Sequence, residues 1–130
     1  MPTTTVAAAI CTGNDDEGFV LLTKRACEPF KGLFCLPGGH IEEYETAEDA
    51  IKREVREETG LEVVALEFAG YRDEIVPEKN IHNVVMLFVC ETTGEIKVDP
   101  NEVSDFYWES LDKAEELDLA FDHKELVKMI

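Results

Sequence analysis

Three glutamates, Glu54, Glu57 and Glu58, stand close together in the segment AIKREVREETGL. If this segment is a helix that turns by about 100° per residue, Glu58 lies on the same side as Glu54, and Glu57 lies on one flank of that side. The same side carries Ala50 and Ile51, so it is the apolar side that should face the core. Burying ionised carboxylates without partners is costly, so we expect a positive group to meet them.

The positive group is predicted to be a divalent cation. Arg53 is a candidate partner, but one guanidinium does not neutralise three carboxylates. Clustered oxygen ligands suit Mg²⁺ or Mn²⁺. The alternative is a surface helix whose glutamates simply reach water. The small alanines beside the glutamates favour the metal, as does the Pro37-Gly38-Gly39 segment, where the backbone must turn tightly or approach something closely.

The helix that positions these glutamates has clear ends in the sequence. Thr46 followed by Asp49 is typical of an N-cap with an acidic residue in the first turn, and Gly60 is a good C-terminal stop. The sequence therefore predicts a helix from Ala47 to Thr59.

Apolar runs separated by turn-forming residues predict the other elements. TTVAAAICT and FVLLTKR, on either side of GNDDEG, predict a β-hairpin from about Val6 to Arg25. Strands are predicted over 61–72, 82–91 and 105–110, a helical turn over 111–117, and a last amphipathic helix over 123–130. This order predicts a single domain, residues 1–130, of the α/β (α+β) class, with helices on both faces of a mixed sheet.

Composition narrows the functional classes. The chain has 12 Lys and Arg against 29 Asp and Glu, a net charge of −17, so binding to the backbone of duplex nucleic acid is not expected. A salt-adapted acidic surface is the alternative interpretation of this charge. No apolar run is long enough to cross a membrane, and the start of the chain lacks the pattern of an export signal. The four cysteines form no CxxC pair, so we expect reduced, mostly buried thiols and a cytoplasmic location.

Residues 39–61, GHIEEYETAEDAIKREVREETGL, resemble the Nudix box. That motif asks for Gly, five residues, Glu, seven residues, Arg-Glu, an aliphatic residue, any residue, Glu-Glu, any residue, Gly and an aliphatic residue. Every defined position matches, through Gly39, Glu45, Arg53, Glu54, Val55, Glu57, Glu58, Gly60 and Leu61. The resemblance implies an α/β/α sandwich with a mixed sheet. It also implies Mg²⁺-dependent hydrolysis, with Mn²⁺ as a substitute, of a nucleoside diphosphate linked to another group.

The resemblance also assigns roles to single residues. Glu57 and Glu58 would be metal ligands, and Glu54 would be a ligand or the base that activates water. The Gly38 carbonyl would be a further ligand. Arg53 would orient the glutamates, and Glu45 would support the loop and the helix. A cation between the carboxylates and the phosphate oxygens would remove the repulsion between an anionic pyrophosphate substrate and an anionic protein.

Four residues outside the box are further candidates. Glu102 would be an extra metal ligand or base, and the alternative is a solvated loop acid. Arg25 would bind phosphate unless it is only a strand-end surface charge, and the same two interpretations apply to Arg72. Asp122 would read the edge of a nucleobase, although a role as helix N-cap is sufficient by itself and is favoured.

The aromatic and histidine residues give weaker predictions. We expect the aromatic side chains to be mostly core, with one or two in a base-stacking pocket, among Phe34, Phe68, Tyr71, Phe88 and Phe106. The histidines are not spaced as metal ligands and receive no catalytic role; they are His40, His82 and His123. The family is often dimeric, so a homodimer is possible, but no exposed apolar stripe in the sequence identifies an interface.

The sequence leaves the substrate open. GLFCLPGGHIE and EKNIHNVVMLFV are more similar to small Nudix enzymes that act on nucleoside triphosphates, so this small-molecule class is favoured. ADP-ribose or a nucleotide sugar is the alternative substrate. A Nudix domain that binds a nucleotide without cleaving it is a second hypothesis, but such domains usually lose box glutamates. An acidic cation-binding module without a nucleotide is a third.

Overall fold

The computed structural model describes residues 3–13 and 18–130, and it contains two sheets. The larger sheet has the strand order β4-β1-β6-β5 and the smaller one the order β3-β2-β7. The strands are β1 (Thr4–Thr12), β2 (Phe19–Arg25), β3 (Phe34–Cys35), β4 (Gly38–His40), β5 (Glu62–Val76), β6 (Ile81–Thr93) and β7 (Val103–Ser110). The helices are α1 (Ala47–Thr59), η1 (Pro77–Lys79), α2 (Leu111–Ala114) and α3 (His123–Val127).

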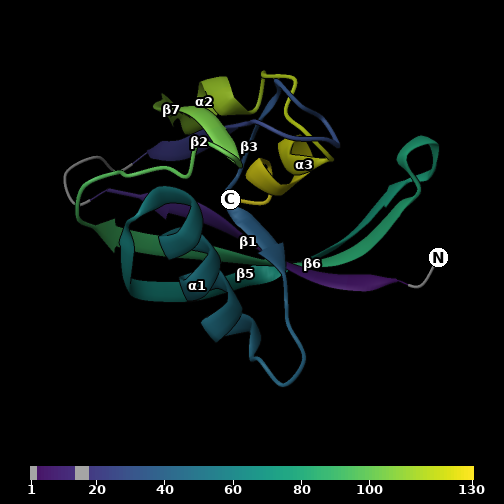
Figure 1. Cartoon of the computed structure of the whole chain (residues 1–130), viewed down its shortest axis with the longest axis horizontal. Coiled ribbons are helices and arrows are strands. Elements are labelled where there is room, and N and C mark those ends of the chain that lie inside the picture. Colours follow the sequence, from purple (N-terminus) through teal and green to yellow (C-terminus); the bar gives the residue numbers. More distant parts are fainter. Residues whose placement is uncertain (1–2, 14–17) are drawn as a thin grey trace.

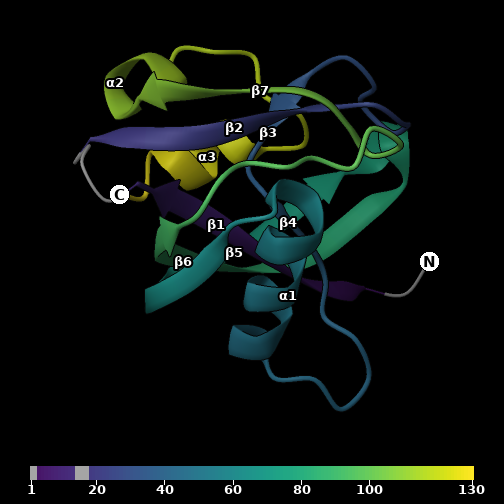
Figure 2. The ribbon, with the colours of Figure 1, turned by 60° about the vertical axis from the view of Figure 1, so that its left-hand side comes forward.

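The elements are stacked in layers around the larger sheet. Helix α1 lies against one face of this sheet, and the smaller sheet lies on the other side together with α2 and α3 (Figure 1, Figure 2). Strand β1 pairs in parallel with β6 and antiparallel with β4, so the larger sheet is mixed. The predicted α+β class with a mixed sheet is confirmed.

Strand β1 is buried on both faces, because its side chains alternate between two cores. Ala7 and Ala9 belong to the cluster that also contains Ile51 and Val55 of α1. Ala8, by contrast, belongs to the cluster that contains residues of β2, α2 and α3. The alanines leave room for a helix to approach the sheet closely, and Glu54 and Glu58 of α1 lie against β4, the neighbour of β1.

Helix α1 has the ends that the sequence predicts. The Thr46 hydroxyl accepts a hydrogen bond from the Asp49 backbone N–H at 3.1 Å. Gly60 ends the helix with a left-handed φ of 77°, a conformation that costs glycine little.

The predicted hairpin from Val6 to Arg25 is wrong. Strands β1 and β2 lie in different sheets: β1 pairs with β4 and β6, whereas β2 pairs with β3 and β7. Because β1 is apolar on both faces, it takes a central position in a sheet and leaves no free edge for β2. The predicted turn includes residues 14–17, which lie outside the described residues.

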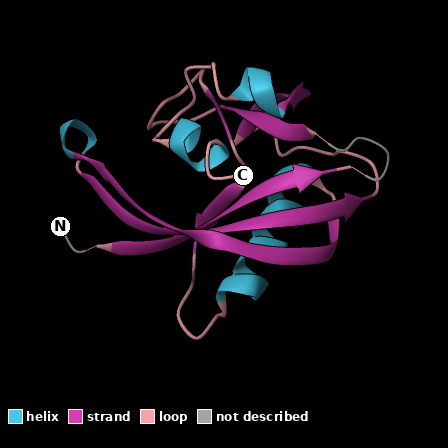
Figure 3. Cartoon of the chain, turned by 180° about the vertical axis from the view of Figure 1, so that it is seen from behind, coloured by secondary structure: helices cyan, strands magenta, loops and turns pink. Residues whose placement is uncertain are grey.

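The strands after α1 are longer than predicted. Strands β5 and β6 form an antiparallel pair joined by η1, and their tip extends away from the rest of the molecule (Figure 3). Strand β7 begins at Val103, two residues before the predicted start. The last helix ends at Val127, although the apolar pattern continued to residue 130.

Most of the aromatic residues predicted for the core lie elsewhere. Phe88 is buried, but Phe68 and Tyr71 are 55% and 62% exposed, because they lie on the edge strand β5. With Val64 and Ile75 they form an exposed apolar row along that strand, which the sequence analysis did not identify. Among the described residues, no helix is both long and apolar enough to cross a membrane.

Candidate active site

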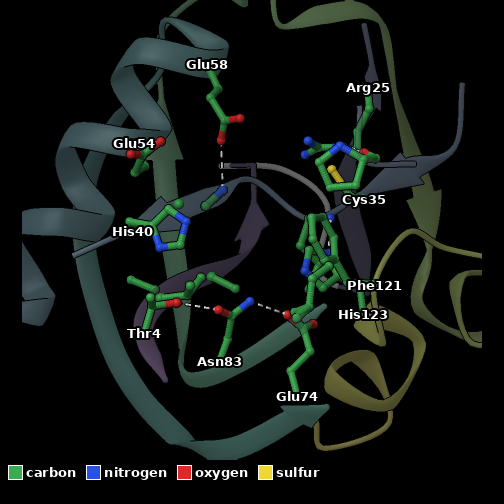
Figure 4. A pocket seen from close by; sticks show the side chains of 18 of the residues that line it. Thr4, Arg25, Cys35, His40, Glu54, Glu58, Glu74, Asn83, Phe121 and His123 are labelled. Atoms are coloured by element: carbon green, nitrogen blue, oxygen red, sulfur yellow. Dashed lines mark hydrogen bonds between the residues drawn. The ribbon is translucent and has the colours of Figure 1, made fainter. Parts of the chain in front are cut away.

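A cavity of about 580 Å³ lies between α1, the larger sheet and the segment before α3. One end is acidic and is lined by Glu54, Glu58 and Glu102. The other end is aromatic and polar, and is lined by residues that include Phe121 and Asn83. Figure 4 shows Glu54 and Glu58 on the side of α1, with the aromatic and polar residues across the cavity.

Glu58 is the most deeply placed carboxylate at the acidic end. Its Oε1 atom accepts a hydrogen bond from the Gly38 backbone N–H at 2.8 Å. Burial raises the pKa of Glu58 to about 8; this hydrogen bond opposes the increase, while the carboxylates of Glu54 and Glu102 add to it. Burial and repulsion between these carboxyl groups therefore disfavour the ionised form of Glu58 more than its hydrogen bond favours it.

Glu54 lies directly against the backbone of β4. A Cβ atom added to Gly39 would stand 2.5 Å from the Glu54 Cδ atom, so glycine is required there by close approach. Burial raises the pKa of Glu54, and its hydrogen bond from Arg53 opposes that increase. Glu57 and Glu102 add to the increase by repulsion.

Arg53 connects the box acids to one another. Its Nε atom donates to Glu45 Oε2 at 2.8 Å, and one terminal nitrogen donates to Glu54 Oε1 at 2.8 Å. That nitrogen also donates to Glu57 Oε2 at 3.2 Å, and the other terminal nitrogen donates to the His40 carbonyl at 3.1 Å. These contacts raise the pKa of Arg53 and lower that of Glu45. They are the contacts that an orienting role requires.

The structure gathers most of the predicted ligands, but it places Glu57 apart. Gly38, Glu54, Glu58 and Glu102 line the cavity. The Glu57 side chain is 56% exposed, pairs with Arg53, and is not among the lining residues. Glu57 is one residue before Glu58, so the helix turns it toward the flank.

The carboxylates fit a divalent cation by chemical type, but they are not arranged as a coordination sphere. In residues 3–13 and 18–130, no group of three or more His, Cys, Asp or Glu side chains is positioned to hold a metal ion. Arg53 engages Glu54 and Glu57, and the Gly38 N–H engages Glu58. Their oxygen atoms are the donors that Mg²⁺ prefers, and their mutual repulsion is the condition that a cation relieves.

The opposite end of the cavity is built around Phe121. Its ring lies over His123, with centroids 5.2 Å apart, and contacts Phe30 at 4.8 Å. The Arg25 guanidinium lies 5.0 Å from the centre of the same ring, while Arg25 Nε donates to the Pro29 carbonyl at 2.6 Å. Arg25 also lines the cavity.

His123 has a structural role that the sequence did not suggest. Its Nδ1 atom accepts a hydrogen bond from the Leu36 backbone N–H at 3.0 Å, so this nitrogen carries no proton. Burial is the main cause that lowers the pKa of His123 to about 4, and the ring is neutral at pH 7.

A row of polar side chains crosses three strands at the aromatic end. Thr4 of β1 donates to the Asn83 side-chain carbonyl, and the Asn83 amide donates to Glu74 Oε1 at 2.8 Å (Figure 4). Thr4 and Asn83 are neighbours across the β1–β6 ladder, and Asn83 and Glu74 across the β6–β5 ladder. The sequence does not reveal this row, because only the strand register brings the three residues together.

Arg72 and Asp122 were predicted as substrate-binding residues, but they pair with each other. Arg72 Nε donates to Asp122 Oδ2 at 2.6 Å, and neither side chain lines the cavity. Asp122 occupies the N-cap position of α3, as the favoured interpretation predicts, but its side chain makes no capping hydrogen bond to the first turn. Its carboxylate is already engaged by the guanidinium.

A model of the NUDIX domain matches residues 1–130 of this chain. An ADP-ribose pyrophosphatase of Methanocaldococcus jannaschii is 38% identical over 117 residues, which are 88% of this chain and 66% of that protein. The chain thus spans just under two thirds of that relative. The nucleoside triphosphatase NudI of an Enterobacter species is 31% identical over 121 residues, which are 85% of this chain and 86% of NudI.

Solved structures show the same fold. The MutT NUDIX hydrolase of Burkholderia pseudomallei superimposes with a TM-score of 0.88 at 25% identity, covering 100% of this chain and 99% of that one. The NUDIX domain of Shewanella oneidensis NrtR, solved in complex with ADP ribose, superimposes with a TM-score of 0.84 at 26% identity. That match covers 99% of this chain and 86% of the other.

Proposed function

Because this chain belongs to the Nudix hydrolase family, we propose that it cleaves the diphosphate linkage of a nucleoside diphosphate derivative with the help of Mg²⁺, for which Mn²⁺ would substitute. The observation that carries the proposal is the single cavity that joins a carboxylate cluster to an aromatic and polar end. A nucleotide has the matching two parts, a charged phosphate chain and a flat polar base.

At the acidic end, Glu54, Glu58 and the Gly38 carbonyl would hold the cation, with Glu57 and Glu102 as the other proposed ligands. When bound, the cation would neutralise phosphate charge and make a bound water more acidic. Glu54 or Glu102 would accept the proton of the attacking water.

Arg53 would keep the carboxylate of Glu54 in place throughout the reaction, since it already donates to Oε1 at 2.8 Å. Arg25 would bind a phosphate oxygen, because its Nε atom donates to the Pro29 carbonyl and the guanidinium carries further N–H donors.

At the aromatic end, Phe121 would form part of the apolar wall beside the base, and Asn83 would hydrogen-bond to the edge of the base. A cavity of about 580 Å³ falls within the range of about 300–1,000 Å³ that is usual for sites of small molecules. Arg72 and Asp122 would support this wall from outside the cavity, rather than touch the substrate as the sequence suggested.

The similarity of this chain to known proteins favours ADP-ribose as the substrate. The pyrophosphatase relative at 38% identity is named for ADP-ribose, and a neighbouring structure holds it. This reverses the preference for nucleoside triphosphates that the sequence motifs suggested. A triphosphate remains the second candidate, because the chain and NudI cover each other over 85% and 86% of their lengths.

Product analysis tests the proposal. The protein is incubated with Mg²⁺ and ADP-ribose, a nucleotide sugar or each nucleoside triphosphate, and the products are separated by chromatography. We expect AMP and ribose 5-phosphate from ADP-ribose. A nucleoside monophosphate and pyrophosphate from a triphosphate would instead assign the second substrate class. Binding without any product would support the non-hydrolytic alternative and overturn the proposal.

We also propose a small-molecule partner rather than duplex nucleic acid, because the net charge is −17. A cytoplasmic location and a homodimer stay predictions.

A further inference from the structure

Two carboxyl groups outside the acidic cluster, the buried Glu74 and the partly buried Asp122, lie beside the Arg72 guanidinium. Glu74 is only 1% exposed and lines the cavity from β5. Its Oε2 atom accepts a hydrogen bond from the Asp122 backbone N–H at 3.3 Å, and its Oε1 atom accepts from the Asn83 amide at 2.8 Å. Glu74 therefore connects the β5–β6 hairpin to the segment that carries Phe121.

The Asp122 carboxylate lacks one hydrogen bond. Its Oδ2 atom accepts from Arg72 Nε at 2.6 Å, whereas its Oδ1 atom is buried and has no partner among the described residues. A buried acceptor without a donor is costly. The Glu74 side chain is within hydrogen-bonding reach of the Asp122 side chain. A proton on Glu74 would provide the missing donor, and the three side chains would then carry no net charge.

We propose that Glu74 and Asp122 share one proton, and that this proton holds the wall of the cavity that carries Phe121 against the β5–β6 hairpin. Glu74 is then a positioning residue: it touches neither the phosphates nor the cation, but it fixes the side chains that bind the base. The choice of ligand rests on the proposed function, whereas the shared proton does not.

The described side chains that contact Glu74 or Arg72 keep their charge near neutral pH, whereas Glu58 at the acidic end of the cavity has a pKa raised to about 8. Arg72 faces the pair from β5, and Asn83 of β6 is uncharged. From α3, His123 is neutral because burial lowers its pKa to about 4. Glu125 acts on Arg72 and also pairs with Lys128 at 3.6 Å.

The direction of the pH effect follows from the raised pKa of Glu74. Burial, and then the neighbouring Asp122 carboxyl, raise this pKa to about 7. The proton is present below that pH and is lost as the pH rises through it. At higher pH two carboxylates face one guanidinium, and their repulsion pushes the Phe121 wall away from β5.

The first test is the pH dependence of KM for ADP-ribose, or for the nucleotide that the product analysis identifies. We expect KM to rise by about fivefold between pH 6 and pH 8, the change that a pKa of about 7 in the free protein and a pKa one unit higher in the complex would give. We expect kcat not to change with pH in parallel with KM. In Glu74→Gln the amide keeps one acceptor and gains an N–H donor without titrating, so the rise of KM between pH 6 and pH 8 should be smaller than in the wild type.

The matched control is Glu67→Gln, because Glu67 is an exposed acid on the same strand. It should keep the pH dependence of the wild type. A wild-type KM that does not change with pH, or a Glu74→Gln variant that keeps the wild-type dependence, would overturn the proposal.

A second test does not depend on hydrolysis. The Glu74 carboxyl carbon, assigned by its absence from the Glu74→Gln spectrum, is followed by ¹³C NMR as the pH changes. We expect a midpoint near pH 7 and a lower midpoint in Asp122→Asn, where the amide donates to Glu74 directly. Titration of the wild-type group near 4.3, the ordinary value for glutamate, would overturn the proposal. A midpoint near 7 and AMP binding that weakens over the same range, without turnover of any nucleotide, would support it while overturning the proposed hydrolysis.

Discussion

Among single residues, Arg53 connects the carboxylates of the acidic cluster to one another. It donates hydrogen bonds to Glu45, Glu54 and Glu57, and it also reaches the backbone carbonyl of His40. The planar guanidinium has five N–H donors, which this number of contacts requires. The ammonium group of lysine has only three donors, and they are not fixed in one plane.

Replacement of Arg53 by lysine should therefore reduce catalysis without unfolding the protein. We expect kcat to fall by about 10²-fold, comparable to the loss of a group that positions catalytic residues. Arg56→Lys is the control, because Arg56 makes a similar two-point contact with Glu62 on the exposed side of the same helix. Equal activity of both variants in steady-state assays would show that Arg53 does not orient the carboxylates.

The box residues could be assigned from the sequence, whereas the aromatic end of the cavity could not. Glu54 and Glu58 are fixed relative to each other by one helix, and their spacing alone reports their geometry. Thr4 and Asn83 are separated by 79 positions and meet only through the parallel register of β1 with β6. No local pattern encodes that register, so the polar row and the role of Glu74 required the structure.

At the scale of elements, α1 depends on its first turn to present the carboxylates. The Thr46 side chain accepts from the Asp49 N–H, and this satisfies one of the unpaired donors of the helix end. Thr46→Ala should lower the free energy of unfolding by about 1 kcal/mol, as measured by chemical denaturation. Thr46→Ser keeps the hydroxyl and should restore most of the loss. A serine variant as unstable as the alanine variant would contradict the capping role.

The contact between β4 and α1 leads to a separate prediction. In Gly39→Ala the new Cβ atom would meet Glu54 at 2.5 Å, so the carboxylate must move away from the cavity wall. We expect kcat to fall by about 10²-fold, the scale of effect of a misplaced catalytic group. Gly13→Ala is the control, because its Cβ atom would meet Trp108 at an ordinary 3.7 Å. Full activity of Gly39→Ala would show that the position of Glu54 is not critical.

The burial of the strand faces explains why the predicted hairpin from Val6 to Arg25 is wrong. The sequence correctly predicts strands on both sides of residues 14–17, but consecutive strands need not pair with each other. The alternating alanines of β1 form contacts on both faces, so β1 is central in the larger sheet, and β2 pairs instead with β7 in the other. The residues of a turn report only the local conformation of the backbone. Which sheet a strand joins depends on the side chains that each face of the strand buries.

At the scale of the whole molecule, buried ionisable groups connect folding to pH. His123 is buried and its pKa is lowered to about 4, below the ordinary value of 6.5. The stability that this group contributes is present above pH 6.5, and it is lost as the pH falls through 4, because the unfolded chain binds the proton first. Glu74 has a raised pKa and acts in the opposite direction, so variants are needed to separate the two.

A comparison of the wild type with His123→Asn isolates the histidine. The asparagine carbonyl retains an acceptor for the Leu36 N–H but does not titrate. Between pH 7 and pH 4.5 we expect the stability advantage of the wild type over this variant to shrink by about 2–3 kcal/mol. The exposed His40 provides the control variant His40→Asn. A stability difference that is constant over this pH range would exclude a buried neutral His123.

The central claim is that the carboxylates of α1 support Mg²⁺-dependent cleavage of a nucleoside diphosphate derivative. The most direct measurement is the rate of AMP release from ADP-ribose, and in parallel of monophosphate release from triphosphates, against Mg²⁺ concentration. It should be made for the wild type, Glu57→Gln, Glu58→Gln and the exposed control Glu48→Gln. We predict turnover only with Mg²⁺, unchanged in the control and about 10²–10³-fold lower in the other two variants, with circular dichroism spectra like that of the wild type. Turnover that persists in EDTA, or that survives both Glu57→Gln and Glu58→Gln, would contradict the account.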